Sequence, residues 1–107
     1  MATGNLIATR AVLAIDPKGR EFTLTLGIGQ PYAISADEWA CAVCAHGLYD
    51  RLADQHGIDS WQSLQLAYQL IARLVEHFVQ SGGRLLWLED GKPISLSELI
   101  PHLNHAA

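Results

Sequence analysis

The sequence predicts an α+β domain in which an antiparallel sheet of four or five strands carries one long helix on one face. Three observations lead to this fold class. Residues 5–28 contain two alternating stretches joined by a tight turn, residues 61–80 form an uninterrupted helical pattern, and residues 84–88 form one further short apolar stretch. Strands that precede and follow a single helix in this order are typical of an antiparallel sheet with the helix packed against it.

The helix is predicted over Trp61–Gln80, because this stretch contains neither Gly nor Pro and consists mainly of strong helix formers. Asp59 or Ser60 can cap its first turn, and with Asp59 as the cap Gln62 can reach back as in a capping box. Gly82 or the next glycine ends the helix in the left-handed conformation. Residues at three- and four-residue steps form the predicted core-facing stripe: Leu64, Ala67, Ile71, Leu74 and Phe78.

Five more apolar residues widen this stripe until little polar surface remains. We therefore expect the helix to be covered on a second side by a partner or by the terminal segment of the chain. The residues concerned are Leu66, Tyr68, Leu70, Val75 and Val79.

A β-hairpin is predicted from Asn5–Ile15 and Arg20–Ile28, joined by the turn Asp16–Gly19. Proline presets the backbone at the second turn position, and glycine takes the position that needs a positive φ. The second strand alternates clearly, so one face is expected to be buried and the other to be wet. The buried face is Phe22, Leu24, Leu26 and Ile28, and the wet face is Glu21, Thr23 and Thr25.

Between the hairpin and the helix, we predict a loop over Gly29–Asp37 and a third strand over Glu38–His46. The stretch Tyr49–His56 fits a helical turn or a short fourth strand, and we favour the strand. After the helix, Arg84–Leu88 is predicted to be a strand.

Beyond the last strand, Ser95 or Ser97 can cap a short helical turn that ends at Ile100. We expect the tail, residues 104–107, to be frayed.

The totals indicate one domain spanning residues 1–107. Half of the residues are hydrophobic and 17% are charged, which excludes a disordered chain. The net charge is −4 and the seven Lys and Arg residues are spread out, so we expect no nucleic-acid binding. A mildly acidic surface would suit a basic protein partner.

The first fifteen residues do not resemble a signal peptide, and no apolar run approaches the roughly 18 residues that span a bilayer. We therefore expect a cytoplasmic protein that does not enter a membrane. Its two cysteines are expected to be reduced thiols.

The pair Cys41 and Cys44 has the spacing of a redox motif or of half a zinc site. In a strand, however, residues three apart face opposite sides of the sheet, so the two sulfur atoms would not meet. No second pair of this kind exists to complete a zinc site. We interpret both cysteines as small buried hydrophobic residues.

The sequence contains no motif that indicates an enzyme. The five histidines form no metal-binding pair at helical spacing, and the serines are explained by helix caps rather than by a nucleophile motif. The segment Gly27–Gly29 lacks the third glycine and the helix of a nucleotide loop. We therefore predict no catalytic residue, no metal ligand and no cofactor.

The tryptophans Trp39, Trp61 and Trp87 are most simply core residues, although Trp and Tyr are also favoured at binding hot spots. Trp61 lies in the first helical turn, and Tyr49 precedes the helix in the ambiguous segment. If any aromatic residue is an exposed anchor, we expect it to be one of these two. The predicted partner-binding set is Tyr49, Asp50, Asp54, Asp59 and Trp61.

Several segments together resemble a family of small bacterial proteins of unknown function. The resemblance spans most of the chain and consists of caps, turns and a helix face. It implies no catalytic residues, supports a strand at Tyr49–His56 and does not include Cys44. The segments are Gly57–Ala67, Gly82–Leu85, Leu6–Arg10, Pro17–Arg20, and Trp39 near Cys41.

The preferred functional interpretation is a non-catalytic protein-binding module, in concrete terms an immunity-type protein that neutralises a toxin. One alternative is an enzyme or a small-ligand binder with its pocket between helix and sheet. Others are a homodimer formed through the helix or a sheet edge and a structural subunit of a larger assembly.

Overall fold

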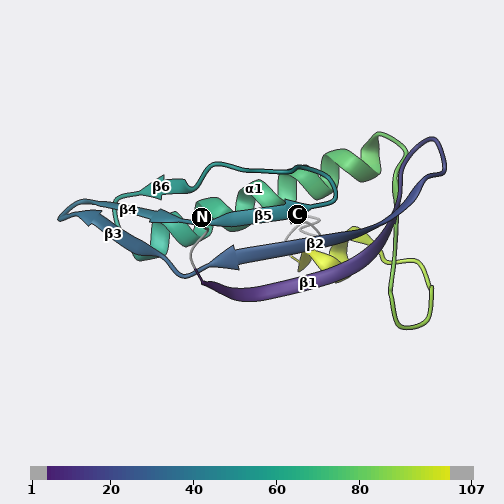
Figure 1. Ribbon diagram of the computed structural model, residues 1–107, viewed down its shortest axis with the longest axis horizontal. Helices are drawn as coiled ribbons and strands as arrows, with labels where there is room; N and C mark the ends of the chain where they lie inside the picture. Colours follow the sequence, from purple (N-terminus) through teal and green to yellow (C-terminus); the bar gives the residue numbers. More distant parts are fainter. Residues whose placement is uncertain (1–4, 102–107) are drawn as a thin grey trace.

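The computed structural model describes residues 5–101 and confirms the α+β fold class. The large sheet has the order β5-β2-β1-β7, and a second small sheet has the order β3-β4-β6; all pairings are antiparallel (Figure 1). The strands are β1 (Leu6–Ile15), β2 (Glu21–Gly29), β3 (Tyr32–Ser35), β4 (Glu38–Cys41), β5 (Val43–His46), β6 (Gln55–Gly57) and β7 (Arg84–Leu86); the helices are α1 (Ser60–Gln80) and α2 (Leu96–Leu99).

The β1–β2 hairpin is confirmed, and so is the division of β2 into two faces. Leu24 and Leu26 are buried, whereas Glu21 and Thr23 are exposed. The turn between the strands is fixed by Asp16, whose carboxylate accepts hydrogen bonds of 2.9 Å from the backbone N–H groups of Lys18 and Arg20.

The helix α1 begins and ends as its sequence predicts. Asp59 is the N-cap, and its carboxylate accepts a 2.8 Å hydrogen bond from the backbone N–H of Gln62. The side chain of Gln62 reaches one residue further back than a capping box requires, since it accepts from the N–H of Ile58 at 2.8 Å. At the other end Gly82 has a φ of +106°. The helix packs on β4, β5 and β6 and also reaches β2 and β7.

The predicted core stripe of α1 is only partly right. Ala67, Ile71 and Phe78 are buried, but Leu64 and Leu74 lie at the margin of the core. The row that faces the sheets also contains a serine, which tolerates burial because its hydroxyl donates to the carbonyl of Ser60 at 3.1 Å. The residues that complete the buried row are Ser63, Ala72 and Val75.

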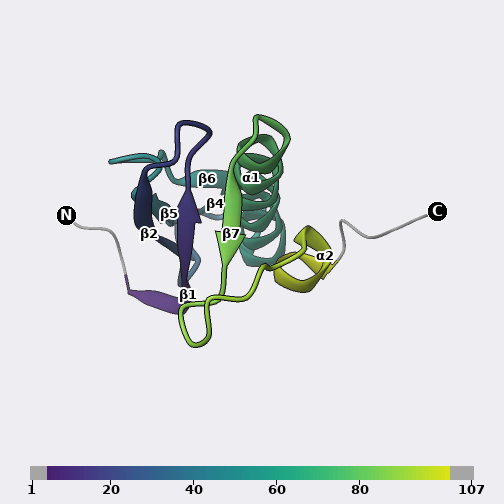
Figure 2. The ribbon, with the colours of Figure 1, turned by 90° about the vertical axis from the view of Figure 1, so that its right-hand side faces the viewer.

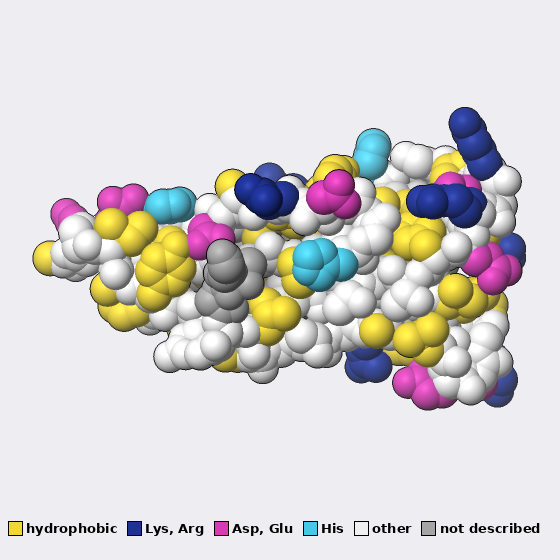
Figure 3. Space-filling model, viewed as in Figure 1, with side chains coloured by type: hydrophobic (Ala, Val, Ile, Leu, Met, Phe, Trp, Pro, Cys, Tyr) yellow, Lys and Arg dark blue, Asp and Glu magenta, His cyan; other side chains and the backbone are white. Residues whose placement is uncertain are grey.

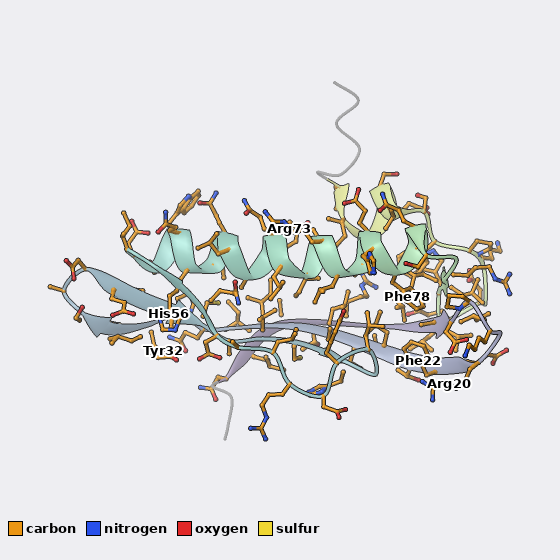
Figure 4. The ribbon with its side chains drawn as sticks, turned by 90° about the horizontal axis from the view of Figure 1, so that it is seen from above. Arg20, Phe22, Tyr32, His56, Arg73 and Phe78 are labelled. Carbon is orange, nitrogen blue, oxygen red and sulfur yellow. The ribbon has the colours of Figure 1, made fainter. Side chains whose placement is uncertain are left out.

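The expectation that α1 is covered on two sides is met only in part. Figure 4 shows Arg73 on the side of α1 that faces away from the sheets, and Gln65, Gln69 and His77 are exposed as well. The terminal segment covers one flank, since Leu96, Leu99 and Ile100 of the α2 region pack against the core. At the far end of the core, the Phe22 and Phe78 rings meet edge to face, 6.0 Å apart (Figure 4).

Two predictions between residues 29 and 46 are wrong. The predicted loop Gly29–Asp37 contains β3, an exposed strand at the edge of the small sheet, where Pro31 can precede it without the loss of a ladder hydrogen bond. The predicted single strand Glu38–His46 is interrupted at Ala42. The carbonyl of Ala42 accepts from the N–H of Gly29, and the chain passes there from the small sheet into the large one.

Two further strand boundaries differ from the prediction. Within Tyr49–His56 only the end is a strand, because β6 pairs with β4 over Gln55–Gly57. The last strand stops at Leu86 rather than Leu88, since the N–H of Trp87 donates to the carbonyl of Lys92 and closes a turn. The short helix α2 is confirmed, with Ser95 as its N-cap. The tail 104–107 lies outside the described residues.

Candidate functional site: a groove beside β1

The candidate site follows from a mismatch in length between β1 and β7. Strand β7 pairs with β1 only over Leu13–Ile15, so β1 continues past the end of its neighbour. Figure 2 shows the start of β1 extending beyond the end of β7; β1 and α2 lie on opposite sides of β7 in this view. Among residues 5–101 no strand pairs with residues 6–12 on the β7 side, and the side chains from 5 to 11 are all exposed.

An apolar groove lies in the space that β7 leaves open, between the hairpin and the two helices. Its inner hollow has a volume of about 150 Å³ and is lined mainly by aliphatic side chains. A closed apolar cavity of about this size holds benzene, so the hollow can admit one aromatic or branched apolar side chain. The lining residues that matter here are Ala8, Arg10, Leu26, Ile71, Leu99 and Ile100.

A second hollow of about 330 Å³ continues the groove along α1. Ile28 and Tyr68 line both hollows, and Gln65 and Gln69 form the exposed rim of the second. The groove lies between helix and sheet, which is the place expected for a small-ligand pocket. Arg10 is the one charged residue among the residues lining the two hollows. The rest of the lining is mainly apolar, so the groove is suited to apolar contact.

The guanidinium of Arg10 is held above an aromatic ring. Its central carbon lies 5.2 Å from the centre of the Trp87 ring, within the range of a cation–π interaction. Trp87 is the residue at which the chain turns away from β7. The turn at Trp87 therefore shortens β7 and also positions the ring that holds the guanidinium of Arg10, the one charged group of the groove.

A polar cluster on the small sheet is the second candidate. Tyr32, Ala40 and His56 lie side by side across β3, β4 and β6. Tyr32 donates a 2.5 Å hydrogen bond to Asp54, and a ring nitrogen of His56 lies 2.9 Å from a carboxylate oxygen of Glu38. Figure 4 shows Tyr32 and His56 close together, and in Figure 3 a histidine lies near acidic side chains at this end.

The two pairs of this cluster cover Ala40, which is fully buried, and connect all three strands of the small sheet. Neither pair lines the groove. Tyr32 is 43% exposed, and both members of the His56–Glu38 pair are about half exposed. Surface pairs of this kind contribute little stability. Their geometry is explained by cross-strand pairing.

The five residues of the predicted partner-binding set are divided between the connection from β5 to β6 and the start of α1. Asp54 is bound to Tyr32, and Asp59 is occupied as the cap of α1. Trp61 is 72% exposed and Tyr49 is 40% exposed, as anchors would be, while Asp50 is exposed in the turn after β5. Residues 47–54 run from the end of β5 back to β6 (Figure 1), so Tyr49 and Asp54 lie at opposite ends of this connection.

Sequence reasoning offered a pocket between helix and sheet as an alternative without naming its residues, and it missed most of the polar cluster. Tyr32 fell in a predicted loop, and Glu38 and His56 fell at strand ends. One signal for the groove was present: the predicted first strand, Asn5–Ile15, is far longer than the predicted last strand, Arg84–Leu88. Strands of such unequal length, once paired, leave part of the longer edge open.

Both cysteines are free and buried, with Cys41 at 0% and Cys44 at 7% exposure. Burial raises the pKa of each thiol above its ordinary value. The Sγ atom of Cys41 donates to the carbonyl of Gly29 at 3.2 Å.

Within residues 5–101 no group of three or more His, Cys, Asp or Glu side chains is arranged to hold a metal ion. In the same part of the chain, no helix is long and apolar enough to cross a bilayer.

Residues 8–97 match the model of a domain of unknown function, DUF6968. The chain belongs to the DUF6968 family. The expected resemblance to a family of unknown function is confirmed at this level, while the particular helix-start pattern Gly57–Ala67 stays a prediction. No curated protein and no solved structure is detectably similar to this DUF6968 domain. The match runs from Ala8, within the open edge of β1, to Ser97 in α2, so it includes the groove residues of β1, β2 and α1 but ends before Leu99 and Ile100.

Proposed function

We propose that this DUF6968 chain is a non-catalytic protein-binding module that recognises its partner through the groove beside β1. The observation that carries the proposal is the combination of an apolar groove with an unpaired strand edge along one wall. Monomeric proteins rarely leave such edges open, because an unpaired strand is a template for pairing with another chain. Apolar contact combined with backbone hydrogen bonding is a recurrent mode of peptide recognition.

Toxin neutralisation, the role of an immunity-type protein, is the concrete form that we propose for this binding. Its support is the net charge of −4, which favours association with a basic partner in the cytoplasm. The exposed Trp61 and Tyr49, with Asp50 nearby in sequence, provide a further surface for such a partner outside the groove.

A small apolar ligand is the second candidate, and the inner hollow of about 150 Å³ is the observation that favours it. A ligand of this kind would need no partner protein. It would also leave the edge of β1 unused.

The test is capture of the partner from a lysate of the native organism with four versions of the tagged protein: the wild type, Gln69→Trp, Gln80→Trp and Trp61→Ser. Gln69 and Gln80 are both exposed on α1, but only Gln69 lines the groove, so Gln80→Trp is a matched control. We expect one stoichiometric protein that the wild type and Gln80→Trp retain and that Gln69→Trp loses.

The remaining outcomes separate the alternatives. A partner lost only from Trp61→Ser would move the binding surface to the start of α1. Retention of the partner by all four baits would exclude both surfaces. Capture of no protein, together with an apolar small molecule in the purified wild type that Gln69→Trp lacks, would favour the small-ligand function.

A further inference from the structure

We propose that the groove is filled by one extended segment of the partner, which adds to the large sheet as a strand beside Ala8–Val12 and places an acidic side chain near Arg10. This inference rests on the proposed protein-binding function and specifies what part of the partner is recognised. It follows from the vacancy in the sheet, the character of the edge, the shape of the groove and its one charge.

The vacancy is the strand position beside β1, which β7 occupies only along the last residues of β1. Strand β7 runs antiparallel to β1 and pairs Leu86 with Leu13. One residue later the N–H of Trp87 donates to the carbonyl of Lys92 at 2.9 Å, and the chain turns back. The position beside Ala8–Val12 therefore continues the line of β7 but holds no strand among the described residues.

The open edge carries little of the usual protection against strand pairing, since Arg10 is its one charged side chain. Natural edges are blocked by Pro, by Lys or by bulges. Ala8–Val12 contains neither Pro nor Lys, and the irregularity in the β1–β2 pairing lies before this stretch, between Leu6 and Ala8. Outward-facing backbone groups of Ala8–Val12 are thus available to an incoming strand, which would gain hydrogen bonds along its length.

The groove matches a strand rather than a helix or a second sheet. Alternate side chains of a strand point to the same face, so every second residue of the incoming segment can be directed into the hollow beside Leu26 and Ile71. Across the groove from β1 stand Leu99 and Ile100. An incoming strand would lie between them and β1, whereas a second copy of the chain would have to bring its own β2 alongside its β1 on the side where Leu99 and Ile100 stand.

The charge of the groove selects the sequence of that segment. Arg10 is the one charged residue in the lining, and its position over the ring of Trp87 limits its freedom. An acidic side chain of the partner would meet it, while a basic one would be repelled. This local preference is opposite to the preference of the acidic protein as a whole, and so gives the groove a specificity of its own.

The experiment supplies the strand by fusion. An eight-residue segment of alternating valine and threonine, with one threonine replaced by glutamate, is joined ahead of the full chain through a flexible glycine-serine linker. A short linker of this type holds the segment at a millimolar effective concentration, and it can fold back antiparallel to β1, as β7 does. The control fusion has proline at two positions of the segment, which prevents pairing.

Amide hydrogen exchange reads out the result at Ala8–Val12. We expect alternate amides of this stretch to exchange about tenfold more slowly in the glutamate fusion than in the unfused chain, as when a site is occupied about ten to one. The proline fusion should match the unfused chain. Gel filtration at two concentrations shows whether each fusion is monomeric, so that strand exchange between molecules is recognised.

A charge exchange tests the acidic preference. Arg10→Glu should reduce the protection about two- to fivefold in the glutamate fusion, and lysine in place of the glutamate should restore it. The matched control is Arg20→Glu, because Arg20 also lies over an aromatic ring, 5.4 Å from the centre of Phe22, but outside the groove. Arg20→Glu should leave the protection unchanged.

Several results would overturn the proposal. One is equal exchange at Ala8–Val12 in the glutamate fusion, the proline fusion and the unfused chain. Another is protection in the unfused chain that increases with concentration, which would identify a second copy as the occupant; protection at every concentration would mean that the edge is already covered. Loss of the native partner from Gln69→Trp without any protection in the fusion would reject strand addition while the protein-binding function stands.

Discussion

The hydroxyl of Tyr32 donates a 2.5 Å hydrogen bond to Asp54, and so joins the outer strand of the small sheet to the residue just before β6. This hydrogen bond is the main reason why the pKa of Tyr32 is raised; partial burial and the negative charge of Asp54 act in the same direction. The contact therefore links the stability of the small sheet to pH.

The first prediction concerns this link. A group whose pKa is higher in the folded state stabilises the fold below its unfolded pKa, about 10 for tyrosine, and the contribution is lost as the pH rises through the folded pKa. Tyr32→Phe should therefore weaken the alkaline loss of stability. The difference in tyrosinate absorbance between a protein with Tyr32 and the same protein with Tyr32→Phe reports the titration of Tyr32 alone. We expect this titration to show a lower pKa of Tyr32 in Asp54→Asn than in the wild type. An unchanged titration in Asp54→Asn would contradict this cause.

The second prediction concerns the cap of α1. Asp59→Ala leaves the N–H of Gln62 without its acceptor and should cost about 1 kcal/mol of unfolding free energy, which lowers Tm by about 4–8 °C. Asp59→Asn keeps an acceptor and should lie close to the wild type. Asp50→Ala removes an exposed carboxylate elsewhere and controls for the change of charge. Thermal unfolding followed by circular dichroism measures all three, and an equal loss in Asp59→Asn would exclude capping as the cause.

The third prediction concerns the close approach of Gly83 to Phe78. A Cβ atom at Gly83 would lie 2.5 Å from the Phe78 ring, which is buried and packed against Phe22. Gly83→Ala should therefore destabilise the protein by about 1–3 kcal/mol in urea unfolding. Ser81→Ala, at an exposed position two residues earlier, should change little. In the background Phe78→Leu the cost of Gly83→Ala should be smaller, and full additivity would argue against the clash.

The fourth prediction concerns the thiols. Because burial raises the pKa values of Cys41 and Cys44, little thiolate forms at pH 8, and an aromatic disulfide reagent should react slowly with the native protein. In denaturant both thiols should react at once. Zinc content should be unchanged in Cys41→Ser and Cys44→Ala. Fast reaction of the native protein, or stoichiometric zinc that either variant loses, would show that the pair has a chemical role.

The elements that sequence reasoning predicted well are those defined by local chemistry. Helix α1 begins after the side-chain cap of Asp59 and ends before the positive φ of Gly82. Short-range sequence patterns reveal both features. The hairpin follows in the same way from the turn at Asp16 and the alternation of β2.

The elements that were missed depend on contacts between distant parts of the chain. Ala40 to Ala45 are all buried, so no alternation marks the point at which the chain changes sheets. The sequence pattern explains Ser63 by helix capping, whereas in the structure Ser63 is buried and its hydroxyl donates to the carbonyl of Ser60 within the core. The groove exists because the chain leaves the edge of β1 at Trp87. The hydrogen bond from the N–H of Trp87 to the carbonyl of Lys92 closes this turn, and the apolar residues around it do not indicate it.

The passage of the chain between sheets at Ala42 has a consequence for how the protein unfolds. Strands β4 and β5 are separated by that one residue, yet one belongs to the small sheet and the other to the large sheet. Fraying that starts in either sheet therefore reaches the other after a single peptide unit, and α1 packs on both. Small domains connected in this way lose their structure in one cooperative transition, so fluorescence from Trp39 in β4 and protection of β2 amides should report the same midpoint.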